Sequence, residues 1–119
     1  MSKETFDYDN LVSSKFPIVT DRQTLAEGEN LIRGTVLGKR TSGGALAIVD
    51  SNSSDGTENP YAVLAEDVDA SLAENLSALI YLSGQFNEDK LVFSTGDTIA
   101  DFKDAMRDKS LFVSGSLQS

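Results

Sequence analysis

The sequence predicts a mainly β domain with one short C-terminal helix, an α+β chain of 119 residues. The first observation is that apolar residues alternate along residues 76–82, which is the period of a strand that buries one face. The second is a series of shorter β-prone runs, separated by turns that contain glycine. The third is a single apolar stripe at helical spacing in residues 97–108. Together they predict several strands and one helix.

Residues 1–17 are predicted to form a flexible N-terminal arm, and residues 18–119 a single β-rich domain. The arm is polar overall but carries large apolar side chains at irregular intervals, at Phe6, Tyr8, Leu11, Val12 and Phe16. Phe6 and Tyr8 share one face of an extended chain, which is typical of a segment that lies on another protein's surface. The alternative is that these side chains pack on their own domain. Pro17 disfavours a helix across the preceding residue.

Short strands are predicted along the first half of the domain. Residues 18–20 form the first of them. Residues 31–38 are also β-prone, and the two glycines within them suit a bulged or sharply bent strand. After a glycine-rich turn, residues 45–49 are predicted to return as the pairing strand. Residues 50–60 form a long polar loop, which should be exposed.

The densest apolar pattern lies in the central part of the chain. The leucines from Leu72 to Leu79 also fit a helical period, but the β-prone run at residues 80–82 favours a strand. Gly84 is expected to end that strand. Residues 91–93 are then predicted to form the next strand, after a polar turn.

The helix is predicted to span Asp97–Asp108. Its apolar stripe consists of Ile99, Phe102 and Met106. Asp97 or Thr98 can cap the start, and basic side chains lie at the end, where the helix dipole favours cations. Residues 111–113 are predicted to be a final strand.

The charge balance argues against nucleic acid as a partner. The chain has 19 acidic and 10 basic residues and a formal net charge of −9. An acidic surface repels phosphate backbones, and the short basic cluster at Lys39–Arg40 does not compensate, so nucleic-acid binding is not expected. No apolar run approaches the roughly 18 residues that a membrane span requires, so no membrane partner is expected either.

The residue types also argue against catalysis. The chain contains no histidine and no cysteine, so the commonest general base and the thiol nucleophile are missing. Without cysteine there is neither a disulfide framework nor a thiolate metal site. The adjacent carboxylates Glu66 and Asp67 could act as an acid–base pair, but chance adjacency is expected in so acidic a chain. We therefore expect no enzyme, no metal site and no cofactor.

Several stretches resemble the head decoration proteins of tailed bacteriophages, the family typified by the lambda decoration protein. The opening residues 2–6 are similar to the start of that protein. Residues 33–38 resemble a strand motif of the wider family. The segment from residues 62–65 to residues 82–88 looks like the family's central segment, in which a strand runs into a Ser-Gly-x-Phe turn. The resemblance covers nearly the whole chain, although residues 51–60 have no counterpart in it.

The resemblance implies a small β-clip-like domain that assembles as a homotrimer. Such trimers occupy three-fold and quasi-three-fold positions on the outer surface of the expanded head, after a period in the host cytoplasm. There they stabilise the head against the pressure of packaged DNA. The family's arm orders by pairing with a strand of the major capsid protein. The residues assigned here to that contact are Thr5, Phe6, Tyr8, Leu11, Val12 and Phe16.

An alternative function is a non-catalytic β-rich module that binds a ligand or carbohydrate. Such a module usually presents aromatic side chains on a concave surface. The chain has three tyrosines and no tryptophan, which makes this alternative less favoured than capsid decoration.

Overall fold

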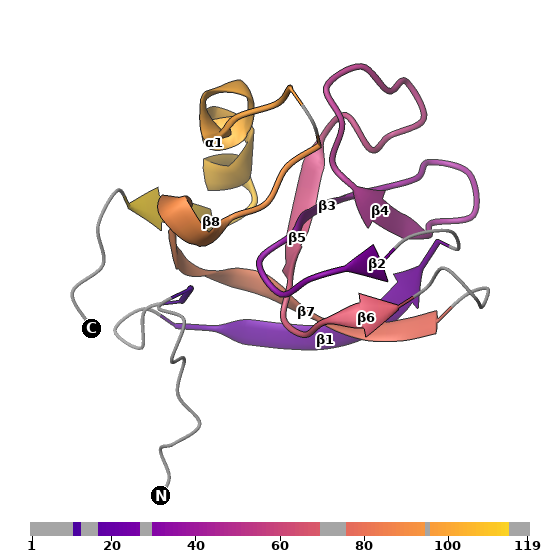
Figure 1. The fold of residues 1–119 in the computed structure, drawn as a ribbon, viewed down its shortest axis with the longest axis horizontal. Coiled ribbons are helices and arrows are strands. Elements are labelled where there is room, and N and C mark those ends of the chain that lie inside the picture. Colours follow the sequence, from indigo (N-terminus) through magenta and orange to yellow (C-terminus); the bar gives the residue numbers. More distant parts are fainter. Residues whose placement is uncertain (1–10, 13–16, 27–29, 70–75, 95, 115–119) are drawn as a thin grey trace, which may run out of the picture.

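The computed structural model describes residues 11–12, 17–26, 30–69, 76–94 and 96–114. The prediction of a mainly β domain with one short C-terminal helix is confirmed (Figure 1). The elements, in chain order, are β1 (Val19–Leu25), β2 (Asn30–Leu31), β3 (Val36–Lys39), β4 (Leu46–Ile48), β5 (Pro60–Leu64), β6 (Val68–Asp69), β7 (Leu76–Asn87), a 3-10 turn (Glu88–Lys90), α1 (Ile99–Asp108) and β8 (Leu111–Ser114).

Six strands form one sheet in the order β1-β4-β3-β5-β7-β8, and an additional β1–β7 pairing closes its first five strands into a ring. The strands β2 and β6 form a separate two-stranded sheet. β8 lies outside the ring, where it extends the sheet from β7 and has α1 beside it (Figure 1). The main sheet therefore has two parts, a closed ring of five strands and the added strand β8.

β7 is the strand that joins the ring to β8. Its first part pairs antiparallel with β1, from Leu76 opposite Leu25 to Ser83 opposite Val19. Its last four residues pair in parallel with β8, beginning with Gly84 opposite Leu111. The predicted strand at residues 76–82 is thus confirmed, and one long strand serves both the ring and the added edge.

The expected end of this strand at Gly84 is wrong, because β7 continues through Gly84 to Asn87. Gly84 has a φ of 156°, and a Cβ built there would lie 3.0 Å from the ring of Phe86. The glycine therefore allows the strand to change partner from β1 to β8 without breaking. The strand predicted at residues 91–93 is also wrong, since only Val92 pairs, in an isolated bridge with Thr35.

The predictions for residues 31–49 are confirmed in part, because the run expected to form one bent strand forms two strands in different sheets. The run at residues 31–38 splits into β2 and β3 at a turn around Gly34, whose φ of 99° suits glycine. The register of β3 against β5 shifts between Leu37 and Gly38, as expected for a bulged strand. β4 then returns antiparallel to β3.

The polar loop at residues 50–60 is partly buried and makes several internal hydrogen bonds, which its composition does not suggest. Gly56 and Thr57 are buried, in contrast to the expectation that the whole loop is exposed. The Thr57 hydroxyl donates to the Asp55 carboxylate at 2.6 Å, and the Asp50 N–H donates to the Thr57 carbonyl at 3.0 Å. The main-chain N–H of Thr41 donates to the Asp55 carbonyl, which ties this loop to the turn before β4.

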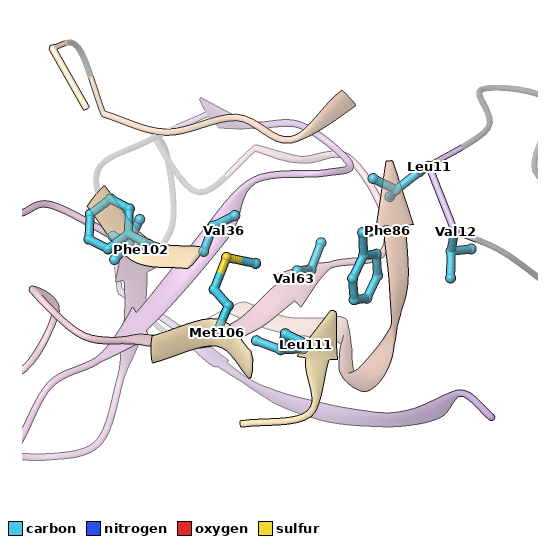
Figure 2. Packing of buried hydrophobic residues seen from close by; sticks show 9 residues of the cluster. Leu11, Val12, Val36, Val63, Phe86, Phe102, Met106 and Leu111 are labelled. Atoms are coloured by element: carbon cyan, nitrogen blue, oxygen red, sulfur yellow. The ribbon is translucent and has the colours of Figure 1, made fainter. Parts of the chain in front are cut away.

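The core consists of two clusters of buried apolar side chains. One, which we call the helix-side cluster, consists of Leu11, Val12, Val36, Val49, Val63, Phe86, Phe102, Met106 and Leu111 (Figure 2). The other fills the ring with Leu25, Leu31, Leu37, Leu46, Ala62, Leu64, Ala78 and Ile80.

The predicted helix is confirmed: it begins at Ile99, two residues later than predicted, and ends at Asp108 as predicted. Phe102 and Met106 are the side chains that it buries, as the apolar stripe predicted. Thr98 occupies the N-cap position, and its N–H donates to the Asp101 carboxylate at 2.8 Å. The ring of Phe93 stacks on Phe102 with their centroids 5.6 Å apart. The helix is thus held in place by its own cap and by the helix-side cluster.

Candidate functional site

Leu11 and Val12 enter the domain as part of its core. Their side chains are 0% and 7% exposed, and both belong to the helix-side cluster. The Asn87 N–H donates to the Leu11 carbonyl at 2.8 Å, and Val12 forms an antiparallel bridge with Phe86. Figure 2 shows the two residues beside Phe86, near the end of β7. Burial of an aliphatic side chain is worth about 1.5–3 kcal/mol, so this short segment is firmly attached.

This placement divides the residues predicted to contact a capsid protein. Leu11 and Val12 pack on their own domain, which is the alternative stated for the apolar residues of the arm. In the chain alone they present no apolar surface to a partner. Thr5, Phe6, Tyr8 and Phe16 lie outside the described residues. Contact with a capsid protein remains a prediction for all six residues.

Three large apolar side chains are exposed at positions that the sequence patterns did not single out. Ile18, Val19 and Ile32 are 39%, 51% and 54% exposed. Ile18 and Val19 precede and begin β1, most of whose residues are exposed. The sequence signal was weak, because β1 pairs with β7 along its length but with β4 only at Leu25, and a strand paired mainly on one side need not alternate between a buried and an exposed face. Scattered exposed apolar residues are common, so these positions are only candidate contacts.

A shallow hollow of about 380 Å³ lies between α1 and β8. It is lined by Lys103, Arg107, Leu111, Phe112 and Val113. Lys103 and Arg107 stand four residues apart on α1 and so lie on one side of it. The sequence analysis missed this pair, because each residue alone looks like an ordinary exposed helix position. Their i, i+4 spacing, together with the following apolar strand, was the signal that could have revealed it.

A second hollow, of about 180 Å³, lies over the turn before β4. Its lining residues are Lys39, Thr41, Gly56, Asn59, Pro60, Tyr61 and Lys109. The Lys39 ammonium lies 4.9 Å from the centroid of the Tyr61 ring. The side chain that could stack on a sugar is therefore already occupied by a cation of the same chain, which gives the carbohydrate-binding alternative no support.

The adjacent carboxylates Glu66 and Asp67 serve the main chain. A Glu66 carboxylate oxygen accepts from the Leu79 N–H at 3.0 Å and lies 3.7 Å from Arg22. Asp67 accepts from the Arg33 N–H at 2.8 Å. Glu66 thus ties the segment between β5 and β6 to β7, and Asp67 ties it to the turn between β2 and β3. Among the described residues, no group of three or more acidic, histidine or cysteine side chains could hold a metal ion.

The part of the chain that the structure describes contains no helix that is long and apolar enough to cross a membrane.

Asp97 links the loop after β4 to the start of α1. Its carboxylate accepts from the Ser51 hydroxyl at 2.5 Å and from the Ser51 N–H at 3.0 Å. These hydrogen bonds stabilise the charged form and lower the pKa of Asp97 below its usual value of 3.8. The hydrogen bonds from Thr57 likewise lower the pKa of Asp55.

The lowered pKa of Asp97 predicts an acid-dependent contribution to stability. Because the folded pKa lies below the unfolded value, the contribution is complete above about pH 5 and is lost as the pH falls through the folded pKa. We expect Asp97→Asn to destabilise the protein at neutral pH and to have a shrinking effect below pH 3.8. Urea unfolding of both proteins, from neutral into acid solution, measures this difference.

Ser51→Ala is the matched control for this prediction. It removes the hydroxyl donor from the same carboxylate, so combining it with Asp97→Asn should add less than the sum of the two effects. A difference between wild type and Asp97→Asn that stays constant at every pH would contradict the assignment.

The fold places the chain among small, mainly β domains that carry one helix. Comparison with protein families makes the assignment specific. The family model described as bacteriophage lambda head decoration protein D matches residues 1–111. A search of the curated proteins finds no match to the chain. The chain therefore belongs to the family of the lambda head decoration protein D, whose members are structural components of the phage capsid.

Proposed function

We propose that this protein is a cement protein of a phage head. It binds as a homotrimer at three-fold and quasi-three-fold positions on the outer surface of the expanded head, and it stabilises the head against the pressure of packaged DNA. Before assembly it resides in the host cytoplasm. The observation that carries this proposal is the family match, which covers both the predicted arm and the β domain in one alignment.

The burial of Leu11 and Val12 supports different roles for two parts of the arm. These two residues hold the base of the arm in the core of the domain. The preceding segment, with Thr5, Phe6 and Tyr8, is the part that contacts the major capsid protein. We assign Phe16 to the same contact. The arm then starts from a fixed point, which reduces the volume that its outer part must search.

The energy of such a contact is adequate only when several arms act together. Each fully covered aromatic side chain contributes on the order of 1.5–3 kcal/mol. Ordering the backbone costs roughly 1–2 kcal/mol per residue, so the net gain of one arm is small. Three arms on one trimer convert small gains into tight binding, because the second and third bind at a high effective concentration.

Two measurements test the proposal. Sedimentation equilibrium should give the mass of three subunits, and the trimer should co-sediment with expanded heads of the same phage that lack decoration protein. Unexpanded heads serve as the control and should bind much less. A protein that stays monomeric both free and on the heads, or that does not bind expanded heads, would overturn the proposal.

A further inference from the structure

β1 is covered by strands on both sides only at its end. It pairs with β7 along its whole length, from Val19 to Leu25, but with β4 only where Leu25 lies opposite Leu46. In Figure 1 it runs along the lower border of the domain. Among the described residues, no strand covers the side of β1 that faces away from β7 between Val19 and Gln23, and we call this side the β1 edge. An unpaired edge is a template on which another extended segment can pair.

The main-chain groups at the β1 edge follow from the hydrogen bonds of β7. Arg22 lies opposite Leu79. The Leu79 N–H donates to the Glu66 carboxylate at 3.0 Å, and the Leu79 carbonyl accepts from the Ala65 N–H at 2.9 Å. Arg22 and Leu79 therefore form a pair without mutual main-chain hydrogen bonds, so the main-chain groups of Arg22 point away from β7, as do those of Thr20 two residues earlier. Both residues are exposed, so a partner can reach these groups.

Two neighbouring apolar side chains are exposed where the β1 edge begins. Ile18 is 39% exposed and Val19 is 51% exposed. The third large apolar side chain that is exposed, Ile32, lies apart from them, in the turn between β2 and β3. A segment that pairs with Thr20 would pass Ile18 and Val19 and remove apolar surface from water, which favours association.

Asp21 argues against a second copy of this chain as the partner at the β1 edge. Its carboxylate accepts from the Arg22 N–H at 2.8 Å. If residues 20–22 paired antiparallel with the same residues of another copy, Asp21 would lie opposite Asp21, and like charges in that position are destabilising. The hydrogen bond to the Arg22 N–H is exposed, so a carbonyl oxygen of a different protein can replace the carboxylate. The β1 edge thus favours a segment of another sequence.

The place of β1 in the fold indicates which protein supplies that segment. Val19 lies opposite Ser83 of β7, and the Ser83 hydroxyl donates to the Pro17 carbonyl at 3.5 Å. Val12, at the base of the arm, forms its bridge with Phe86 of the same strand. The base of the arm and the start of β1 are therefore attached to nearby positions of β7. A protein that is held by the arm lies next to the β1 edge.

We propose that the β1 edge binds an extended segment of the capsid subunit, which adds beside β1 as a further strand. The main chain of that segment pairs with Thr20 and Arg22, and its apolar side chains cover Ile18 and Val19. That the partner is the capsid subunit rests on the proposed function. This contact is separate from the one assigned to the arm, because it uses a strand of the folded domain and none of residues 1–17.

The first test blocks the β1 edge and leaves the β1–β7 ladder in place. Thr20→Pro removes an N–H that points away from β7, which is a position where an edge strand tolerates proline. Thr20→Val is the matched control, because it keeps the N–H and loses only the hydroxyl. We expect Thr20→Pro to weaken binding to expanded heads that lack decoration protein by roughly 10-fold or more, and Thr20→Val by less than about threefold. Thermal melts of both free proteins show whether they are folded.

The second test concerns the apolar side chains. Ile18→Ser with Val19→Ser makes the start of the β1 edge polar, and Ile32→Ser is the control at an exposed apolar position elsewhere. We expect the double variant to weaken binding to the same heads by roughly 10-fold, and the control by less than about threefold.

A third measurement does not depend on substitution. Amide hydrogen exchange of the peptide that contains residues 18–23 should slow when the wild-type protein binds heads. Unchanged exchange in this peptide, or full binding by both Thr20→Pro and the serine double variant, would overturn the inference. Exchange that slows in the free protein as its concentration rises would show that a second copy covers the β1 edge, and would also overturn it. If Thr20→Pro does not fold, the serine variants and the exchange measurement decide. If the wild type does not bind heads at all, the proposed function fails first.

Discussion

Leu11→Ala should destabilise the protein by about 2–5 kcal/mol, the usual cost of truncating a buried leucine. Leu11 is fully buried and lies in the same cluster as Phe86 and Leu111. Its truncation would leave a cavity inside that cluster. Urea denaturation gives the free energy of unfolding directly. Because a domain of this size is commonly stable by only about 5–15 kcal/mol, the loss should lower the unfolding midpoint clearly.

Ile18→Ala is the matched control, since it removes a comparable side chain that is 39% exposed. We expect an effect within about 1 kcal/mol there. An equally small effect of Leu11→Ala would show that the segment around Leu11 does not hold the core together.

The same burial changes what can be deleted from the N-terminus. The sequence patterns predict residues 1–17 to be an arm outside a domain of residues 18–119, and on that division the arm could be removed while the domain stays folded. Removing them takes Leu11 and Val12 out of the helix-side cluster, together with the hydrogen bond from the Asn87 N–H. We therefore expect the deletion of residues 1–17 to destabilise the domain at least as much as Leu11→Ala, because it leaves a larger cavity and an unpaired main-chain donor.

Deletion of residues 1–10 should instead remove most of the binding to expanded heads and leave the melting temperature unchanged. This deletion preserves Leu11 and Val12 but takes away Phe6 and Tyr8. A loss of about 1.4 kcal/mol per arm weakens one arm tenfold, and three arms acting together by roughly a thousandfold. Co-sedimentation with heads measures the binding, and a thermal melt of the free protein measures the stability.

Phe6→Ala with Tyr8→Ala tests the side chains without shortening the chain, and Ser2→Ala with Lys3→Ala is a control in the same segment. The aromatic pair should reproduce much of the loss caused by the deletion, and the control should not. If the shortened protein decorates heads at full affinity, the arm is not the anchor. If the shortened protein melts at a lower temperature, residues 1–10 contribute to the core.

The sequence patterns predicted the elements in which apolar residues recur at a regular spacing. The alternation along residues 76–82 and the stripe of Phe102 and Met106 each gave the correct element, because one face of each is buried. Gly34 was expected to bend one strand, but it lies in the turn that separates β2 from β3. The prediction that β7 ends at Gly84 was wrong, because a glycine that ends a strand and a glycine at which a strand changes partner look the same in a sequence.

What the patterns could not show depends on contacts between distant segments. Leu11 and Val12 have no periodic neighbours, and only the position of Phe86, which is far along the chain, explains their burial. The pairing of β1 with β7 that closes the ring also joins segments that are far apart in sequence. The cationic hollow requires α1 and β8 to be placed side by side, so its two charged residues gave no signal apart from their spacing.

The bridge between Val12 and Phe86 also determines how a mechanical load would travel through the protein. Tension applied to the chain ahead of Leu11 reaches the domain at β7, which β1, β5 and β8 hold by main-chain pairing along its length. In the antiparallel β1–β7 ladder the hydrogen bonds run across the strands, so a pull along β7 shears many of them together. Peeling would break them one after another at much lower force. A load that passes through the bridge into β7 is therefore shared by many main-chain hydrogen bonds of the ring, and β7 itself should resist it.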